Sequence, residues 1–260
     1  LNICGLGMQH QPHVQYTDAV VPPKAQRREE WWILGKLEQA LGYRSVFDEG
    51  DTPDIFARLD RMLKYSELSV AKLQAAPHHT AVLPAPAPGR FYDEYIQTGD
   101  GRVDCCPPLF AGALTQARSI FDELLAEPPS TLKLINLRTN YMHNSWYQNV
   151  EKLRRGRHQG NPLHMAPADA ARLGLADGDA VLVRNAHGEL PAAVFVDESL
   201  QAGVVAMAHG GGQERSHGLR IAKQYPGVNV NVLLPSGPGS YEKLSNQAHM
   251  TGVPVSVVRR

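Results

Sequence analysis

The hydrophobic pattern of this chain changes after the paired prolines Pro128 and Pro129. From there on, apolar and polar residues alternate with a period of two in residues 131–138, 180–184 and 190–196. This period is typical of β-strands that bury one face. Turn-forming stretches such as DGD and NAHGE separate the strands. Many short strands joined by tight turns favour a closed β barrel over an open sheet.

One short helix is expected among these strands. Pro167 stands where the first turn of a helix tolerates proline, and Gly174 follows as a stop, so residues 167–173 are predicted to be helical. The change of pattern places a domain boundary near Ser130. We therefore expect one domain over residues 1–130 and a barrel domain over residues 131–260.

The first half of the chain has helical periodicity instead. Apolar residues recur at three- and four-residue intervals in residues 27–41, 54–64 and 114–125, which predicts three amphipathic helices. The first helix should bury Ile33, Leu37, Ala40 and Leu41. The third should bury Ala117, Ile120, Phe121 and Leu124.

Two further segments of this half lack helical periodicity. The stretch at residues 76–89 is rich in proline, which predicts a surface connector. The stretch at residues 91–106 contains Gly99, Asp100 and Gly101 and predicts a short hairpin.

The composition excludes some classes of function. Lys plus Arg and Asp plus Glu total 26 each, so the neutral chain offers no electrostatic argument for a nucleic-acid partner. No apolar run approaches the roughly 20 residues that span a bilayer, so no membrane span is expected. The chain starts at Leu1 without a leader pattern, from which we expect a cut inside a longer polypeptide and no readable localisation signal.

The three cysteines do not form a metal-binding pattern. Cys105 and Cys106 are adjacent and Cys4 stands alone, whereas iron–sulfur and zinc sites use spaced pairs. We expect reduced thiols that are buried or half-buried, which favours a cytoplasmic location.

The densest cluster of polar side chains lies in the segment TNYMHNSW at residues 139–146. It follows a predicted strand and contains Asn140, His143, Asn144, Ser145 and Trp146. Uncharged donors and acceptors at this density suit a ligand with many hydrogen-bonding edges, such as a pterin or a guanine. The alternative is an Asx-turn loop whose side chains satisfy their own backbone.

Three other features could extend such a site. Arg138 stands at the strand end, where a guanidinium could bind phosphate, while the basic run at residues 152–157 is more often a solvated face. His209 precedes three glycines, which let a backbone approach a planar ligand closely, although a plain hairpin loop is the alternative. Asn229 and Asn231 alternate in GVNVNV and should face the same side of a strand, where hydrogen bonding between strands is the competing role.

The eleven histidines do not indicate a metal site of the protein's own. His158, His164 and His187 are dispersed, and the sequence has no H-E-x-x-H frame, Walker loop or G-x-S-x-G elbow. We therefore predict no catalytic residue and no protein metal ligand in this chain.

Taken in order, five segments resemble the C-terminal part of the molybdopterin oxidoreductases related to dimethyl sulfoxide reductase. They are NLRTNYMHNSWYQN, NPLHMAPADAARLGLADGDAVLVRNAHGE, GVVAMAHGG, PGVNVNVLLPSG and SNQAHMTGVPV. QYTDAVVPP followed by REEWWILGKLEQALG is similar to the family more weakly, because Thr17 and Val21 replace the usual Ala and Leu. Gly211 also stands where an aromatic residue is common.

This resemblance implies a mixed, α+β fold. A six-stranded double-psi β barrel is implied for residues 131–260, preceded by the tail of an α/β domain. The loop at residues 139–146 would lie against the pterin and phosphates of a molybdopterin guanine dinucleotide. Ser245 and Asn246 would lie at the last turn that faces the cofactor.

The implied intact protein is an oxidoreductase that holds molybdenum or tungsten between two such dinucleotides. It would perform a two-electron conversion of a small molecule and exchange electrons with a partner through an iron–sulfur cluster. The cluster and the metal's protein ligand would lie outside this chain, which alone should be inactive. Two alternatives stay open: a non-catalytic double-psi barrel that binds proteins or peptides, and a small barrel enzyme similar to aspartate decarboxylase that would need Gly239–Ser240 as a cleavage site.

Overall fold

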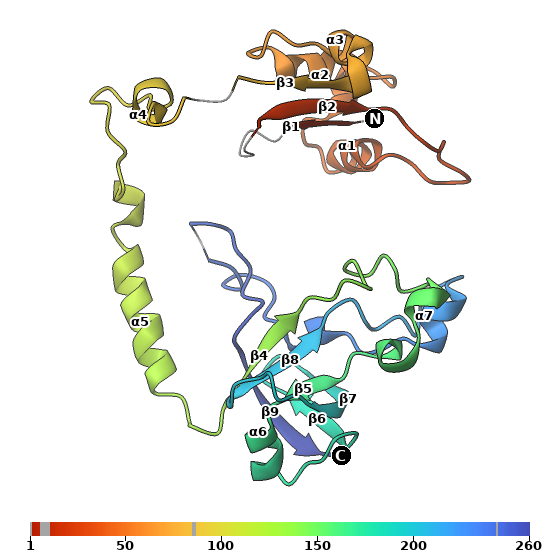
Figure 1. The fold of residues 1–260 in the computed structure, drawn as a ribbon, viewed down its shortest axis with the longest axis vertical. Helices are drawn as coiled ribbons and strands as arrows, with labels where there is room; N and C mark the ends of the chain where they lie inside the picture. The colour runs from red at the N-terminus through yellow and green to blue at the C-terminus, as the bar shows by residue number, and fades with distance from the viewer. Residues whose placement is uncertain (1, 6–10, 85–86, 243) are drawn as a thin grey trace. The chain divides into compact units, whose positions relative to one another are not determined.

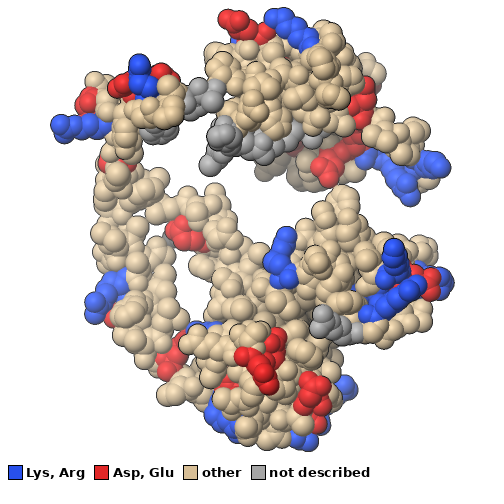
Figure 2. Space-filling view, viewed as in Figure 1, with Lys and Arg blue, Asp and Glu red and all other residues tan. Residues whose placement is uncertain are grey.

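A computed structural model describes residues 2–5, 11–84, 87–242 and 244–260 of the chain. The chain divides into two compact units, Leu1–Asp104 and Cys105–Arg260. The boundary near Ser130 stays a prediction. No helix among the described residues is both long and apolar enough to cross a membrane. On the face drawn in Figure 2, basic and acidic side chains are interspersed within each unit.

The first unit is built on a small antiparallel sheet in the order β1-β2-β3 (Figure 1). Its strands are β1 (Asn2–Gly5), β2 (His13–Thr17) and β3 (Thr80–Val82). Helix α3 (Val70–Ala75) contacts β2 and also α2 (Ile55–Leu63). The core between them consists of Val14, Tyr16, Leu63, Val70 and Leu73.

Helix α1 (Glu30–Ala40) confirms the first predicted helix but not its predicted buried face. Ile33, Leu37 and Leu41 are all more than half exposed. Gly35 is the buried residue instead, because it packs against the short 3-10 helix η1 (Val46–Glu49). A Cβ on Gly35 would lie 2.6 Å from Cγ2 of Val46, so this contact requires glycine.

The predicted connector and hairpin of this unit are both corrected. Residues 76–89 contain the 3-10 helix η2 (Pro77–His79) and strand β3, whose three residues lack proline and pair with β2. The described part of residues 91–106 contains the helix α4 (Phe91–Glu94) and no strand. Thr98 instead closes a tight turn, since its carbonyl accepts from Gly101 N at 3.0 Å and its hydroxyl donates to Arg102 O at 2.7 Å.

The second unit confirms the closed six-stranded barrel, with the strand order β4-β8-β5-β7-β6-β9 (Figure 1). The strands are β4 (Leu132–Leu137), β5 (Leu163–Met165), β6 (Ala180–Arg184), β7 (Glu189–Val196), β8 (Val204–Ala208) and β9 (Val253–Arg259). The pairs β4–β8 and β5–β7 are parallel, and the other pairs are antiparallel. This mixed closed barrel is a double-psi β barrel.

Period-two alternation explains how these strands fill the barrel. Val181 and Val183 are fully buried and point inward from β6, whereas Ala180 and Arg184 are exposed. The core also contains Leu132, Leu134, Leu163, Met165, Leu190, Val194, Val205, Met207, Val253, Val255 and Val257.

Helix α6 (Pro167–Arg172) confirms the predicted short helix, but it is not the only one in this region. Helix α7 (Arg220–Gln224) and the 3-10 helices η4 (Glu151–Leu153), η5 (Gly156–Gln159) and η6 (Val230–Leu233) were missed. The Oδ1 of Asn149 accepts from Ile221 N at 2.9 Å and from Ala222 N at 3.3 Å. The backbone donors at the start of α7 are thus satisfied by a distant residue, so no local signal marks this helix.

The segment before the barrel contains the 3-10 helix η3 (Pro108–Phe110) and α5 (Ala113–Leu125). Helix α5 confirms the third predicted helix, but no residue of its predicted face is buried. Ile120, Phe121 and Leu124 are about half exposed. Cys105 and Cys106 are also exposed, so the expectation of buried or half-buried thiols is wrong for them.

Candidate functional site

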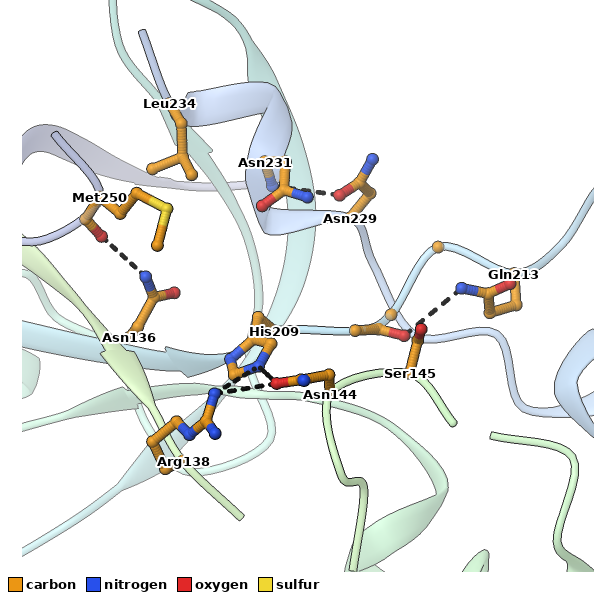
Figure 3. A pocket seen from close by; sticks show the side chains of 13 residues that line it. Asn136, Arg138, Asn144, Ser145, His209, Gln213, Asn229, Asn231, Leu234 and Met250 are labelled. Atoms are coloured by element: carbon orange, nitrogen blue, oxygen red, sulfur yellow. Dashed lines mark hydrogen bonds between the residues drawn. The ribbon is translucent and has the colours of Figure 1, made fainter. Parts of the chain in front are cut away.

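The parallel pair β4–β8 brings two loops to the same end of the barrel. Leu137 pairs with Ala208 at the last register position. The next residues along the chain, Arg138 and His209, therefore leave the barrel side by side. A pocket of about 540 Å³, here called the β4–β8 pocket, lies at this edge (Figure 3). It is lined by Asn136, Arg138, Asn144, Ser145, His209, Gly210, Gly211, Gly212, Gln213, Asn229, Asn231, Leu234 and Met250.

Three side chains form a triangle on one wall of this pocket (Figure 3). Arg138 Nη1 donates to Asn144 Oδ1 at 2.9 Å, and His209 Nε2 lies 3.0 Å from the same oxygen. Arg138 Nη1 and His209 Nε2 are 3.3 Å apart. Because a guanidinium only donates, the amide of Asn144 must turn its oxygen toward Arg138.

The electrostatics of the pocket favour an anionic ligand. Burial, and secondarily the positive charge of Arg138, lower the pKa of His209 below its usual value, which keeps this imidazole neutral near pH 7. The pocket lining contains no Asp or Glu among the described residues. The guanidinium of Arg138 is therefore the dominant charge at the site.

The loop after β4 adopts a backbone conformation that suits asparagine. His143 and Asn144 have φ angles of 44° and 60°, in the left-handed region where asparagine is tolerated better than most residues. The turn is closed by Trp146 N, which donates to the carbonyl of His143 at 3.2 Å. This conformation directs Asn144 and Ser145 to the pocket.

The glycines after His209 allow the opposite loop to approach closely. A Cβ on Gly210 would collide with the backbone carbonyl of Asn144, and a Cβ on Gly212 would lie 2.6 Å from the Cβ of Asn229. Both glycines also have φ angles above 90°. These glycines therefore let the two loops pack closely, while the expected approach of the glycine run to a planar ligand stays a prediction.

Buried polar side chains connect the loops around the pocket. Gln148 donates a hydrogen bond to the carbonyl of Gly210. Arg154 Nη2 donates to the carbonyls of Gln159 and Tyr225, and both of these distances are 2.6 Å. Gln148 and Arg154 are each only 2% exposed. Arg154 therefore connects the backbone at Gln159 to the backbone at Tyr225, although it belongs to a basic run for which a solvated face was expected.

Asn229 and Asn231 reach the pocket from a different element than expected. They flank the start of η6, where Asn229 is the N-cap and its Oδ1 accepts from Asn231 N at 3.1 Å. The prediction of a strand here is wrong, because this capping hydrogen bond stabilises a helical turn. Both side chains nevertheless line the same pocket as Asn144 and His209.

Six of the eleven predicted site residues line the β4–β8 pocket: Arg138, Asn144, Ser145, His209, Asn229 and Asn231. Asn140, His143, Trp146, Ser245 and Asn246 are not in its lining. The ring of His143 packs near Trp146 and Tyr147, with centroids 5.8 and 5.3 Å apart. Ser245 is held by the carboxylate of Glu242, to which its backbone N donates at 2.7 Å. Cofactor contact by these five residues stays a prediction.

Sequence reasoning missed Asn136, Gln213, Leu234 and Met250 in the lining. Asn136 could have been found, because it shares the parity of Leu132 and Leu134 on a strand whose inward face is otherwise apolar. Its Nδ2 donates to the carbonyl of Met250 at 2.7 Å.

A second cavity, of about 440 Å³, brings together two histidines that are separated in the sequence. His158 and His164 both line it, and His164 Nδ1 lies 2.9 Å from Asp197 Oδ2. Hydrogen bonds from Ser199, and then from His164, lower the pKa of Asp197 to about 2. Among the described residues, no group of three His, Cys, Asp or Glu side chains is arranged to hold a metal ion.

The chain is similar to known proteins in sequence and in fold. Residues 132–249 match a family described as "Molydopterin dinucleotide binding domain". The chain is 27% identical over 210 residues to the "Probable oxidoreductase YyaE" of Bacillus subtilis (strain 168), covering 76% of this chain and 30% of that protein. The fold is similar to acetylene hydratase from Pelobacter acetylenicus, with a TM-score of 0.64, 16% identity, and coverage of 95% of this chain and 35% of that one.

Proposed function

We propose that the β4–β8 pocket binds the pterin dinucleotide, because residues 132–249 match the molydopterin dinucleotide binding domain family and the chain is similar to part of a probable oxidoreductase. The observation that carries this proposal is that polar side chains from three separate segments line one pocket together with Arg138. Asn144 and Ser145 come from the loop after β4, His209 and Gln213 from the loop after β8, and Asn229 and Asn231 from the start of η6.

The chemistry of the lining fits such a ligand. A pterin dinucleotide has a pyrophosphate and ring edges that both donate and accept hydrogen bonds. Arg138 supplies a cation for the phosphates, and amides and a hydroxyl supply donors and acceptors for the rings. A volume of about 540 Å³ is within the usual range for a ligand pocket.

The role of this chain is to bind and orient. When bound, the cofactor supplies the metal and its redox chemistry. Arg138 would hold the anionic part, Asn144 and neutral His209 would keep the guanidinium in place, and the glycines at 210–212 would bring the backbone close to a ring face.

The activity of the whole protein is a wider proposal, because the chain spans about a third of the length of these relatives. We propose a molybdenum or tungsten protein with two pterin guanine dinucleotides, which converts a small molecule by two electrons. It would exchange electrons with a partner through an iron–sulfur cluster held elsewhere in the protein. The oxidoreductase name of the Bacillus subtilis relative supports this choice. A cytoplasmic location is part of the same proposal.

Cofactor content of the full-length protein tests the binding proposal. Arg138→Gln removes the cation of the pocket, and Arg184→Gln removes an exposed arginine of β6 that does not line it. We expect Arg138→Gln to contain less than a fifth of the wild-type metal and of the GMP released by acid hydrolysis, and Arg184→Gln to match the wild type. Equal occupancy in all three proteins would contradict the proposal.

A further inference from the structure

Asn161 lies two residues before the start of β5 and forms hydrogen bonds with the segments behind the β4–β8 pocket. Its Nδ2 donates to the carbonyl of Ala208 at 2.7 Å and to the carbonyl of Val228 at 2.9 Å. Its Oδ1 accepts from Val228 N at 2.8 Å. Both donor positions and the oxygen of the side chain are thus bound to backbone groups, and the residue is only 7% exposed.

The backbone around Asn161 is shaped to admit this amide. A Cβ on Gly227 would collide with Asn161 Oδ1. A Cβ on Gly211 would lie 2.5 Å from the carbonyl oxygen of Val228 and 3.0 Å from Asn161 Nδ2. Gly211 belongs to the loop after β8, and Gly227 to the segment before η6. Gly227 therefore leaves room for the amide of Asn161, and Gly211 leaves room chiefly for the Val228 backbone to which this amide is bound.

The anchored residues stand directly beside residues of the pocket. Ala208 precedes His209 and Val228 precedes Asn229, whereas Asn161 itself is not in the pocket lining. From this arrangement we infer that Asn161 is a positioning residue, which sets the separation between the His209 loop and the Asn229 segment in the β4–β8 pocket. The inference rests on the proposed function only for the identity of the ligand.

A purely structural role for Asn161 is the alternative. The other end of β8 offers a matched control. Asp169 accepts from Gly203 N at 2.6 Å and is 4% exposed, so it anchors the residue that precedes β8 as Asn161 anchors the end of β8. A five-residue strand separates these anchors by about 16 Å. Asp169→Asn should therefore perturb the fold without reaching the pocket.

The test uses the chain with Asn161→Ser, which shortens the side chain without adding charge, and Asn161→Leu, which keeps its size but removes its hydrogen bonds. Three quantities are measured in 0.15 M salt: the thermal midpoint, the affinity for GMP as the probe, and the pKa of His209 by NMR. His209→Gln assigns the signal, and the signal of His164 serves as an internal reference.

Both Asn161 variants should raise the pKa of His209 toward its usual value, since the loop would move away from Arg138 and into solvent. They should also weaken GMP binding at least tenfold. Asp169→Asn should lower the thermal midpoint while leaving the pKa of His209 at its wild-type value and the GMP affinity within twofold of wild type. A His209 pKa that stays at its wild-type value in a folded Asn161 variant would overturn the inference.

Two other outcomes are also decisive. If both Asn161 variants fail to fold while Asp169→Asn folds, Asn161 is a structural residue and the inference is wrong. If the wild type does not bind GMP, the proposed function loses support, but the His209 titration still decides whether Asn161 positions this loop.

Discussion

The Nε2 of His209 lies 3.0 Å from the Oδ1 of Asn144, although 65 positions separate the two residues in the chain. The contact exists because β4 and β8 are parallel neighbours, so the loops that follow them start at the same end of the barrel. Both side chains also contact the guanidinium of Arg138.

Asn144→Asp tests the charge of the site. The new carboxylate would pair with Arg138 and neutralise it, while aspartate also tolerates the left-handed conformation at this position. We expect at least a fivefold loss of metal and GMP from the full-length protein. The thermal midpoint of the cofactor-free chain should change by no more than about 4 °C, equivalent to about 1 kcal/mol. Gln201→Glu, on the exposed surface of the barrel, makes the same change of charge and should retain the cofactor.

Gly210→Ala tests the close approach of the two loops. The new Cβ would collide with the carbonyl of Asn144, whereas a Cβ on Gly178, with φ at 84°, would have no neighbour within 4 Å. Gly178→Ala should cost about 1–2 kcal/mol for the left-handed backbone alone. Gly210→Ala should cost about 2 kcal/mol more in urea unfolding, because of overpacking. Equal losses in the two variants would show that the loops are not in contact.

Arg154→Ala tests whether this buried arginine is structural. The substitution leaves the carbonyls of Gln159 and Tyr225 without their donor, and each such group costs about 1–3 kcal/mol. We expect the free energy of unfolding to fall by about 2–4 kcal/mol. Arg155→Ala, at an exposed neighbour, should stay within about 0.5 kcal/mol of wild type. If Arg154→Ala leaves the free energy of unfolding unchanged, the Arg154 side chain is in solvent and is not structural.

The lowered pKa of His209 predicts a pH dependence of stability. Since its pKa in the folded chain is below the usual value of 6.5, the unfolded state binds more protons as the pH falls. The stability associated with neutral His209 is therefore present above pH 6.5 and is lost as the pH falls toward the folded pKa. Between pH 7 and pH 5, the wild type should lose stability more steeply than His209→Gln, by at most about 1.4 kcal/mol per pH unit. Parallel curves would contradict the assigned environment of His209.

Strands β4, β6 and β7 could be predicted because alternation with a period of two follows directly from burial of one face. β6 lies where the pattern placed it, with Val181 and Val183 inside. For the helices α1 and α5, the sequence pattern predicted the helix but not the burial of its apolar side. Periodicity identified the apolar side of each helix, but it cannot show what covers that side, and Ile33 and Phe121 are exposed.

The residues that shape the pocket were harder to predict than those that line it. Asn144 and His209 stood out as polar groups at strand ends. Asn161 and Gln148 did not, because their partners are backbone groups that lie 47 to 67 positions away. The helical turn at Asn229 was missed because a single capping hydrogen bond outweighs the alternating pattern of GVNVNV.

If the β4–β8 pocket holds the pterin dinucleotide, a crystal structure of the cofactor-loaded, full-length protein will show the cofactor there. We predict that phosphate or ring atoms of the cofactor lie within hydrogen-bonding distance of Arg138 and of at least two of Asn144, Asn229 and Asn231. Cofactor density on another face of the barrel, with the pocket filled by protein side chains, would contradict the claim.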